Sequence, residues 1–138
     1  MQQLMTKESL DKFLNKEFPQ VSKNFRILDV SDQSFSMLMY ITEEHLRPGA
    51  TVSGPTMFLL ADITFYLATL SIIGLKSLTV TTNCSINFLR KPNEKNLTSK
   101  ARILKLGKTL SVGDVLIYSD GIDEPVAHAS LTYSIPQK

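Results

Sequence analysis

The sequence predicts one α+β domain over residues 1–138, in which a curved antiparallel sheet of about five strands wraps around one long central helix, with a short N-terminal helix. Two observations predict this class. Residues 55–73 are apolar on almost every side, as in a helix that is buried all round. Residues 78–90 then alternate apolar and polar side chains, which indicates a strand with one face against a core. A helix enclosed by a sheet satisfies both observations.

Length, charge and cysteine content exclude several classes of protein. The chain has 138 residues, 43% of them hydrophobic, which is enough to bury a core without disulfides or metals. The 15 basic and 13 acidic residues leave a net charge of +2, and no basic stripe with interleaved aromatics points to nucleic acid. Cys84 is the single cysteine, so no internal disulfide or cysteine metal cluster can form, and a cytoplasmic location is expected. We predict no metal and no cofactor.

The apolar segment 55–73 is long enough to be tested as a membrane span. Asp62, Pro55 and three threonines interrupt it, and neither an aromatic belt nor a basic cluster flanks it. We therefore expect a buried core helix and no membrane partner. The first 13 residues contain no apolar run after their charges, so no secretory signal is expected either.

Local signals set the ends of both predicted helices. The first helix, over 7–18, begins after Thr6 as N-cap and ends before Pro19. Its apolar residues recur at helical spacing: Leu10, Phe13, Leu14 and Phe18. The long helix over 55–73 ends at Gly74 as C-cap.

The remaining elements are predicted to be strands joined by turns. Strands are expected at 25–30, 34–41, 78–90, 97–106, 109–119 and 126–135, with a loop over 42–54. The Asp32-Gln33 step indicates a tight hairpin between the first two strands. In the strand over 78–90 we expect the even-numbered residues to face the helix: Leu78, Val80, Thr82, Cys84, Ile86 and Phe88.

Two motifs occur in an order and spacing typical of a known family. Residues 47–55 (RPGATVSGP), with an acid at Asp62, are similar to the pattern Asn-x-x-Gly-x-Val-His-Gly-Gly followed by a helical Asp or Glu. The spacing from Ser53 to Asp62 equals that from the family's histidine to its acid. Residues 85–92 (SINFLRKP) are similar to a strand that ends in Phe-Leu-Arg-Pro. Over residues 25–135 the chain thus resembles the hotdog-fold acyl-CoA thioesterases, in particular the phenylacetate-pathway (PaaI-like) type.

The resemblance implies hydrolysis of an acyl-CoA thioester to the free acid and coenzyme A. It assigns Asp62 as catalytic base or nucleophile and the Gly54 amide as the donor to the oxyanion. Thr81 aligns with a hydroxyl that some members use, so it is a candidate for orienting a water, as is Thr64 on the helix.

Three positions depart from the family pattern. The family's asparagine falls at Arg47, its histidine at Ser53 and its second glycine at Pro55. The asparagine and histidine roles therefore do not carry over. Ser53 is either a catalytic hydroxyl or the N-cap of the helix.

The spacing of the two main candidates implies two chains per site. Gly54 and Asp62 are eight residues apart, about 12 Å along a helix at 1.5 Å per residue, which is too far for one reacting carbonyl to touch both. A symmetric homodimer in which each chain lends one group to a shared site removes this difficulty. The resemblance implies the same assembly, and we expect dimers to pair into a dimer of dimers.

Substrate contacts are expected at the helix and at the end of the strand over 78–90. Arg90 and Lys91 are candidates for binding coenzyme A phosphates, or are solvated charges at a strand end. Arg47 is expected at the mouth of the site or on the surface. The expected apolar contacts with the acyl group are Val52, Met57, Phe58, Phe65 and Tyr66.

Proteins of this fold can also have two other functions. A protein of this fold that binds acyl-CoA or lipid without catalysis is the alternative to a hydrolase. A dehydratase or hydratase needs a histidine beside the acid, and neither His45 nor His128 is near Asp62 in the sequence.

Overall fold

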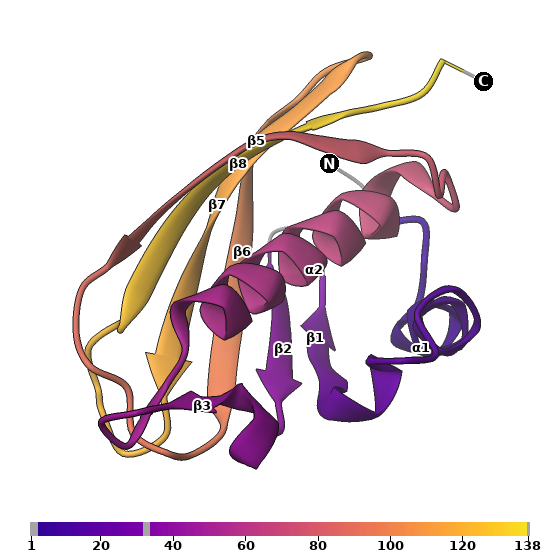
Figure 1. Ribbon diagram of the computed structural model, residues 1–138. Helices are drawn as coiled ribbons and strands as arrows, with labels where there is room; N and C mark the ends of the chain where they lie inside the picture. Colours follow the sequence, from indigo (N-terminus) through magenta and orange to yellow (C-terminus); the bar gives the residue numbers. More distant parts are fainter. Residues whose placement is uncertain (1–2, 32–33, 138) are drawn as a thin grey trace.

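A computed structural model describes residues 3–31 and 34–137, which form a curved sheet around one central helix (Figure 1). The predicted Asp32-Gln33 hairpin lies outside the described residues. The helices are α1 (Lys7–Glu17) and α2 (Gly54–Ile73). The strands are β1 (Phe25–Val30), β2 (Phe35–Met39), β3 (Leu46–Arg47), β4 (Thr51–Val52), β5 (Val80–Phe88), β6 (Leu97–Leu106), β7 (Leu110–Ser119) and β8 (Ala127–Ser134).

The main sheet has six strands in the order β1-β2-β6-β7-β8-β5, and every neighbouring pair is antiparallel. All six predicted strand segments join this one sheet, which is why it is one strand wider than expected. The predicted loop over 42–54 contains a short 3₁₀ turn, Glu43–His45, and the separate hairpin of β3 and β4. The predicted hotdog fold, a sheet wrapped around a central helix, is confirmed.

The central helix α2 is held at both ends by the residues that the sequence indicated. The Ser53 hydroxyl accepts a hydrogen bond from the Thr56 N–H at 3.3 Å, and Pro55 occupies the first turn, where its missing N–H costs nothing. Gly74 ends the helix with φ of 88°, a conformation that glycine adopts without strain.

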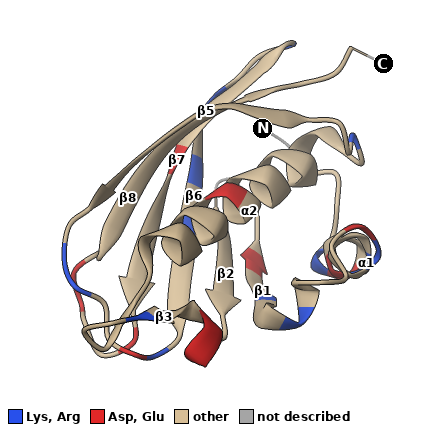
Figure 2. Cartoon of the chain, viewed as in Figure 1, with Lys and Arg blue, Asp and Glu red and all other residues tan. Residues whose placement is uncertain are grey.

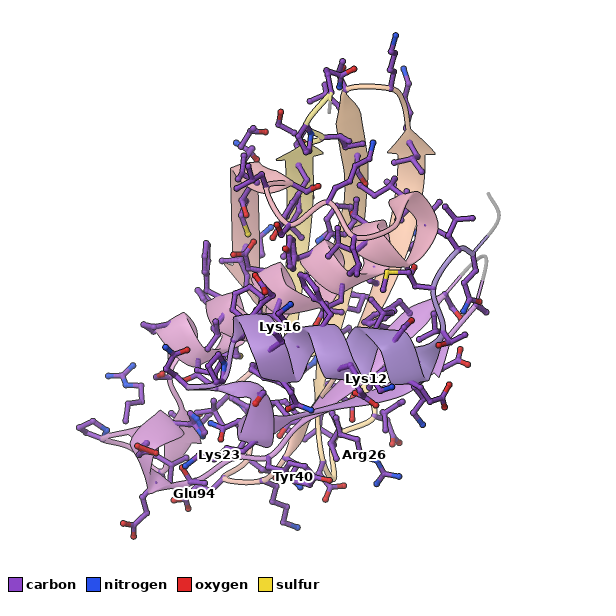
Figure 3. The ribbon with its side chains drawn as sticks, turned by 90° about the vertical axis from the view of Figure 1, so that its right-hand side faces the viewer. Lys12, Lys16, Lys23, Arg26, Tyr40 and Glu94 are labelled. Atoms are coloured by element: carbon purple, nitrogen blue, oxygen red, sulfur yellow. The ribbon has the colours of Figure 1, made fainter. Side chains whose placement is uncertain are left out.

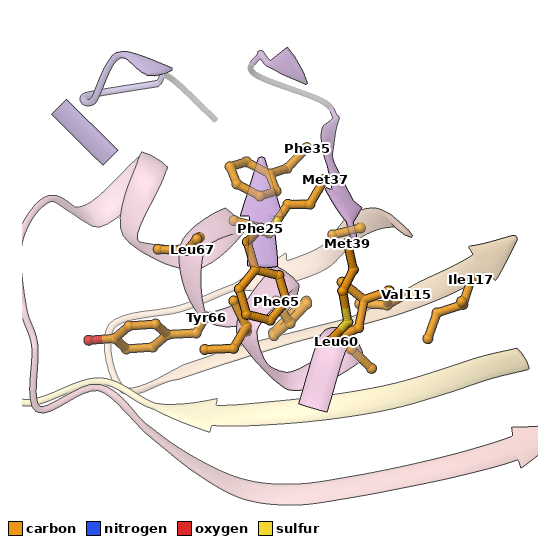
Figure 4. Packing of buried hydrophobic residues seen from close by; sticks show 14 of the residues in the cluster. Phe25, Phe35, Met37, Met39, Leu60, Phe65, Tyr66, Leu67, Val115 and Ile117 are labelled. Carbon is orange, nitrogen blue, oxygen red and sulfur yellow. The ribbon is translucent and has the colours of Figure 1, made fainter. Parts of the chain in front are cut away.

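Nearly the whole surface of α2 is buried by the fold. Figure 4 shows Phe25 of β1 and Met39 of β2 packed with Leu60 and Phe65 of α2. By length and composition α2 could cross a membrane, but 78% of its most apolar window is buried within this chain, as expected for a core helix.

Helix α1 covers one side of the molecule and presents its charges outward. It begins at a capping box in which the Ser9 N–H donates to the Thr6 hydroxyl at 3.1 Å, as predicted for Thr6. Its own residues Leu10 and Leu14 are buried on the side that faces the core, whereas Lys12 and Lys16 lie on its outer side (Figure 3).

Strand β5 contains a bulge that reverses the side chains on one side of it. The pairing with β8 shifts between Thr81 and Asn83, so Thr82 is an extra residue in this strand. Because a one-residue insertion exchanges the two faces of a strand, Thr81 and Cys84 both point toward α2.

The bulge makes part of the predicted pattern wrong. Leu78 and Val80 are 75% and 52% exposed rather than packed on the helix. Beyond the bulge the prediction is confirmed, because Cys84 and Ile86 pack against the core and the Phe88 ring lies beside the start of α2.

Candidate active site

A pocket of about 230 Å³ opens beside the middle of α2, with Asp62 in its wall. Asp62 is half-buried and is the one charged residue of α2, the red band on that helix in Figure 2. The pocket is lined by Phe18, Asp62, Ile63, Tyr66, Ser77, Thr79, Val80, Thr81 and Tyr133. The acid therefore sits at a largely apolar surface that is open to a small ligand.

Two hydroxyl groups hold one oxygen of the Asp62 carboxylate. The Thr81 hydroxyl donates to Oδ1 at 2.7 Å. The Tyr133 hydroxyl makes a very short hydrogen bond to the same Oδ1 and also approaches the Asp62 backbone oxygen at 2.9 Å. Within residues 3–31 and 34–137, Oδ2 receives no hydrogen bond, so it is the oxygen available to a water or substrate.

Tyr133 was missed by the sequence reasoning. It lies on the inward row of β8 with Ala129 and Leu131, so a hydroxyl on an otherwise apolar row was the available signal. Burial, and then the hydrogen bond to Asp62, raise the pKa of Tyr133 far above its usual value. Its hydroxyl therefore stays protonated and can serve as a donor.

The surroundings of Cys84 disfavour it as a nucleophile. Burial and then the negative charge of Asp62 raise the pKa of its thiol, which disfavours the reactive thiolate.

A second pocket, of about 590 Å³, lies at the start of α2. It brings together six residues that the sequence proposed for the site: Arg47, Val52, Gly54, Met57, Arg90 and Lys91. The Arg90 guanidinium donates to the Pro125 carbonyl at 2.8 Å, which holds it near the turn after β5. Basic side chains and the N-terminus of a helix thus share one wall, a setting that favours anions.

Gly54 leaves little room for a side chain at the start of α2. A Cβ at this position would lie 3.3 Å from Cζ of Phe88, tighter than ordinary packing. As the first residue of the helix, Gly54 has an N–H group without an intrahelical acceptor, and this group borders the second pocket.

Three other predicted site residues do not line the pocket at the start of α2. Tyr66 lines the Asp62 pocket and donates to the Ser77 carbonyl at 3.0 Å, and burial, followed by the charge of Glu17, raises its pKa to about 12. Phe65 lines neither pocket, because it is fully buried on the sheet side of the helix. Phe58 lines neither pocket because it points outward and is 40% exposed. Neither ring lines either of these two pockets of the single chain, so the predicted acyl contacts of Phe65 and Phe58 stay predictions.

The remaining hydroxyl candidates differ in their hydrogen-bond partners. Ser53 caps α2 and its hydroxyl lies 2.8 Å from that of Thr56, which favours the capping role over a catalytic one. Thr64 is buried and bonds to Ser99 at 2.7 Å, away from Asp62. Of the hydroxyls proposed from the sequence, Thr81 is the one that contacts Asp62.

Neither histidine lines the Asp62 pocket. The His45 ring accepts a hydrogen bond from the Thr42 N–H at 2.9 Å, and His128 lies 3.1 Å from Asp114 on the outer face of the sheet. The arrangement that a histidine-dependent dehydratase needs is therefore not present among the described residues of this pocket.

Comparison with known proteins identifies the family. The model of the thioesterase superfamily matches residues 49–126, which include α2 with Gly54 and Asp62. A crystal structure of a candidate thioesterase from a Silicibacter species is 45% identical, with a TM-score of 0.92 over 99% of this chain and 95% of that one. Comparison with curated proteins gives no match.

More distant structures share the fold. Zebra fish thioesterase superfamily member 2 is 17% identical, with a TM-score of 0.84 over 96% of this chain and 100% of its own. The Escherichia coli PaaI protein from the phenylacetic acid degradation operon is 22% identical, with a TM-score of 0.80 over 95% of this chain and 96% of its own. Since the family model spans more than half of the chain and the 45% identical relative nearly all of it, this protein belongs to the hotdog-fold thioesterase superfamily.

Proposed function

We propose that this protein hydrolyses acyl-CoA thioesters, with Asp62 as general base. The observation that carries the proposal is that α2 borders two pockets. One is largely apolar and contains the Asp62 carboxylate, and the other is basic and contains the N-terminus of the helix. Membership of the thioesterase superfamily supports thioester hydrolysis as the reaction type. The acyl-CoA substrate is supported by the charges that surround Gly54.

The chemistry follows from the free oxygen of Asp62. Oδ2 accepts a proton from a water as the water oxygen attacks the thioester carbonyl carbon. The Gly54 N–H stabilises the negative charge that develops on the carbonyl oxygen. The carbon–sulfur bond then breaks, and the proton held by Asp62 passes to the departing sulfur, which leaves as the thiol.

Two chains are needed to bring these groups together. Gly54 and Asp62 border different pockets, and eight residues of helix separate them by roughly 12 Å. Strand β5 ends the sheet with an unpaired edge that carries exposed apolar side chains, Val80 at 52% and Phe88 at 53%. Pairing of two such edges would form a homodimer that places one chain's Gly54 near its partner's Asp62 pocket.

The two pockets divide the substrate between them. The basic pocket, with Arg47, Arg90 and Lys91, suits the phosphates of coenzyme A. The Asp62 pocket, whose walls include the Tyr66 and Phe18 rings, suits a small acyl group, because about 230 Å³ holds no long chain.

The test is Asp62→Asn, assayed for thiol release from short, medium and aryl acyl-CoAs. Loss of a general base should lower kcat by roughly 10²–10⁴-fold, with a much smaller change in KM. Asp123→Asn makes the same change at an exposed turn and is the matched control.

Two results would overturn the proposal. Equal turnover by wild type and Asp62→Asn would exclude Asp62 as the base. Tight binding of acyl-CoA by the wild type without thiol release from any substrate would instead favour the non-catalytic binding protein.

A further inference from the structure

Tyr133 reaches Asp62 from a part of the fold that holds it firmly. Its strand, β8, lies inside the sheet between β7 and β5, and its ring is 2% exposed. The ring packs against those of Phe65 at 5.6 Å and Tyr66 at 6.0 Å between centroids. Because all three rings are wedged together, the Tyr133 hydroxyl has little freedom to move away from α2.

The hydroxyl contacts two oxygens of the same residue. Its single proton lies between Oδ1 and the backbone oxygen of Asp62, while Thr81 donates to Oδ1 from the opposite strand. With both donors on one oxygen, rotation of the carboxylate about its Cβ–Cγ bond would break two hydrogen bonds. The free Oδ2 is thereby kept in a single direction.

No cation among the described lining residues of the pocket holds the Asp62 carboxylate in place. The described lining contains no lysine, arginine or histidine, and the hydrogen bonds to the Asp62 carboxylate come from the hydroxyl groups of Thr81 and Tyr133. The other titratable groups that face Asp62 are the Cys84 thiol on β5 and the Tyr66 hydroxyl on α2. Neither of these makes a hydrogen bond to the Asp62 carboxylate.

We propose that Tyr133 is a positioning residue for catalysis, which anchors Oδ1 of Asp62 so that Oδ2 points at the attacking water. The role rests on the proposed function, since it acts through the proposed base. Tyr133 itself touches neither water nor substrate in the reaction. It determines which of the two carboxylate oxygens accepts the proton.

The test is Tyr133→Phe, which keeps the ring and its packing and removes one hydroxyl. Losing a hydrogen bond to a charged group should lower kcat by roughly 10–100-fold while KM changes little. A purely structural defect would instead lower the amount of active enzyme and leave the KM of the remaining enzyme and its response to Asp62→Asn unchanged, so active-site titration is run on the same sample.

Tyr118→Phe is the matched control. It makes the same atomic change on the neighbouring strand, where Tyr118 contacts Lys100 rather than the site. We expect its kcat and KM to equal those of the wild type.

A second readout separates this inference from the proposed function. The ¹³C NMR chemical shift of the Asp62 carboxyl reports its hydrogen bonds and can be compared at one fixed pH in wild type and Tyr133→Phe, where we expect it to change, with Asp62→Asn used to assign the signal. If the wild type shows no thioesterase activity, the proposed function fails, and the NMR comparison still tests the contact between Tyr133 and Asp62. An unchanged chemical shift of the Asp62 carboxyl, or an unchanged kcat beside an inactive Asp62→Asn, would overturn the role of Tyr133.

Discussion

Gly113 lets the sheet and the central helix approach closely at one point. It lies in β7 opposite Ile103 and Leu131, and a Cβ there would overlap the Arg102 carbonyl oxygen and the Phe65 ring. Glycine is favoured where another part of the fold comes this near to the backbone. The buried Phe65 ring in turn packs against Tyr133. A side chain at Gly113 would therefore displace the ring that supports Tyr133 beside Asp62.

We predict that Gly113→Ala destabilises the protein by about 3 kcal/mol, the upper part of the range for overpacking, because one of the clashing groups is backbone and cannot rotate aside. Gly107→Ala is the control, since its Cβ would lie 3.7 Å from the Leu110 oxygen, an ordinary contact. Equilibrium denaturation in urea at one protein concentration measures both. Equal midpoints for the two variants would show that the sheet can yield at Gly113.

Helix α1 contributes to the site as well as to the core. Phe18, at its C-terminal cap, forms part of the wall of the Asp62 pocket. Its ring packs edge-on to those of Tyr66, at 5.8 Å, and Phe13, at 6.5 Å. An element that looks like a cover on the sheet thereby limits the space beside the carboxylate.

Enlarging this pocket should change which acyl groups are accepted. We predict that Phe18→Ala raises kcat/KM for longer or bulkier acyl-CoAs relative to short ones by roughly tenfold, as expected when a pocket gains room for additional methylene groups. Phe18→Leu should give an intermediate ratio. The ratio is measured with paired substrates on the same sample, so a loss of active protein cancels. A ratio that stays constant across the three proteins would place the acyl group elsewhere.

The elements with local signals were predictable, and contacts set by long-range pairing were not. The N-cap at Thr6, the apolar helix and its acid at Asp62 are all visible within short windows. The meeting of Thr81 with Tyr133 depends on the pairing of β5 with β8 and on a bulge at Thr82 that no glycine marks. A helix that is apolar all round also gives no signal to show which of its aromatic residues faces a pocket.

At the scale of the whole molecule, α2 borders the Asp62 pocket and the Gly54 pocket at separate places along its length. In a symmetric pair every complete site would combine the Asp62 pocket of one chain with the Gly54 pocket of the other. The site would then belong to the assembly, and a monomer would lack activity even with all of its residues intact.

Mixing two inactive variants tests this sharing. Asp62→Asn removes the base, and Gly54→Pro removes the backbone N–H donor at the first residue of α2, a helix position that tolerates proline. After unfolding and refolding together, random pairing should restore about a quarter of wild-type sites, since half of the dimers are mixed and each has one intact site. Each variant refolded alone is the control. No recovery in the mixture would show that both groups act within one chain.

The two edges of the sheet are unequal, and this limits how far chains can add to one another. The β1 edge is short, carries the exposed charges of Arg26 and Asp29, and is bent by a bulge after Ile27. The β5 edge, Val80–Phe88, is long and has no charged residue. A sheet with one receptive edge and one protected edge can join to a second copy once, after which no receptive edge remains. Growth by strand addition would therefore stop at a closed pair instead of continuing into a fibre.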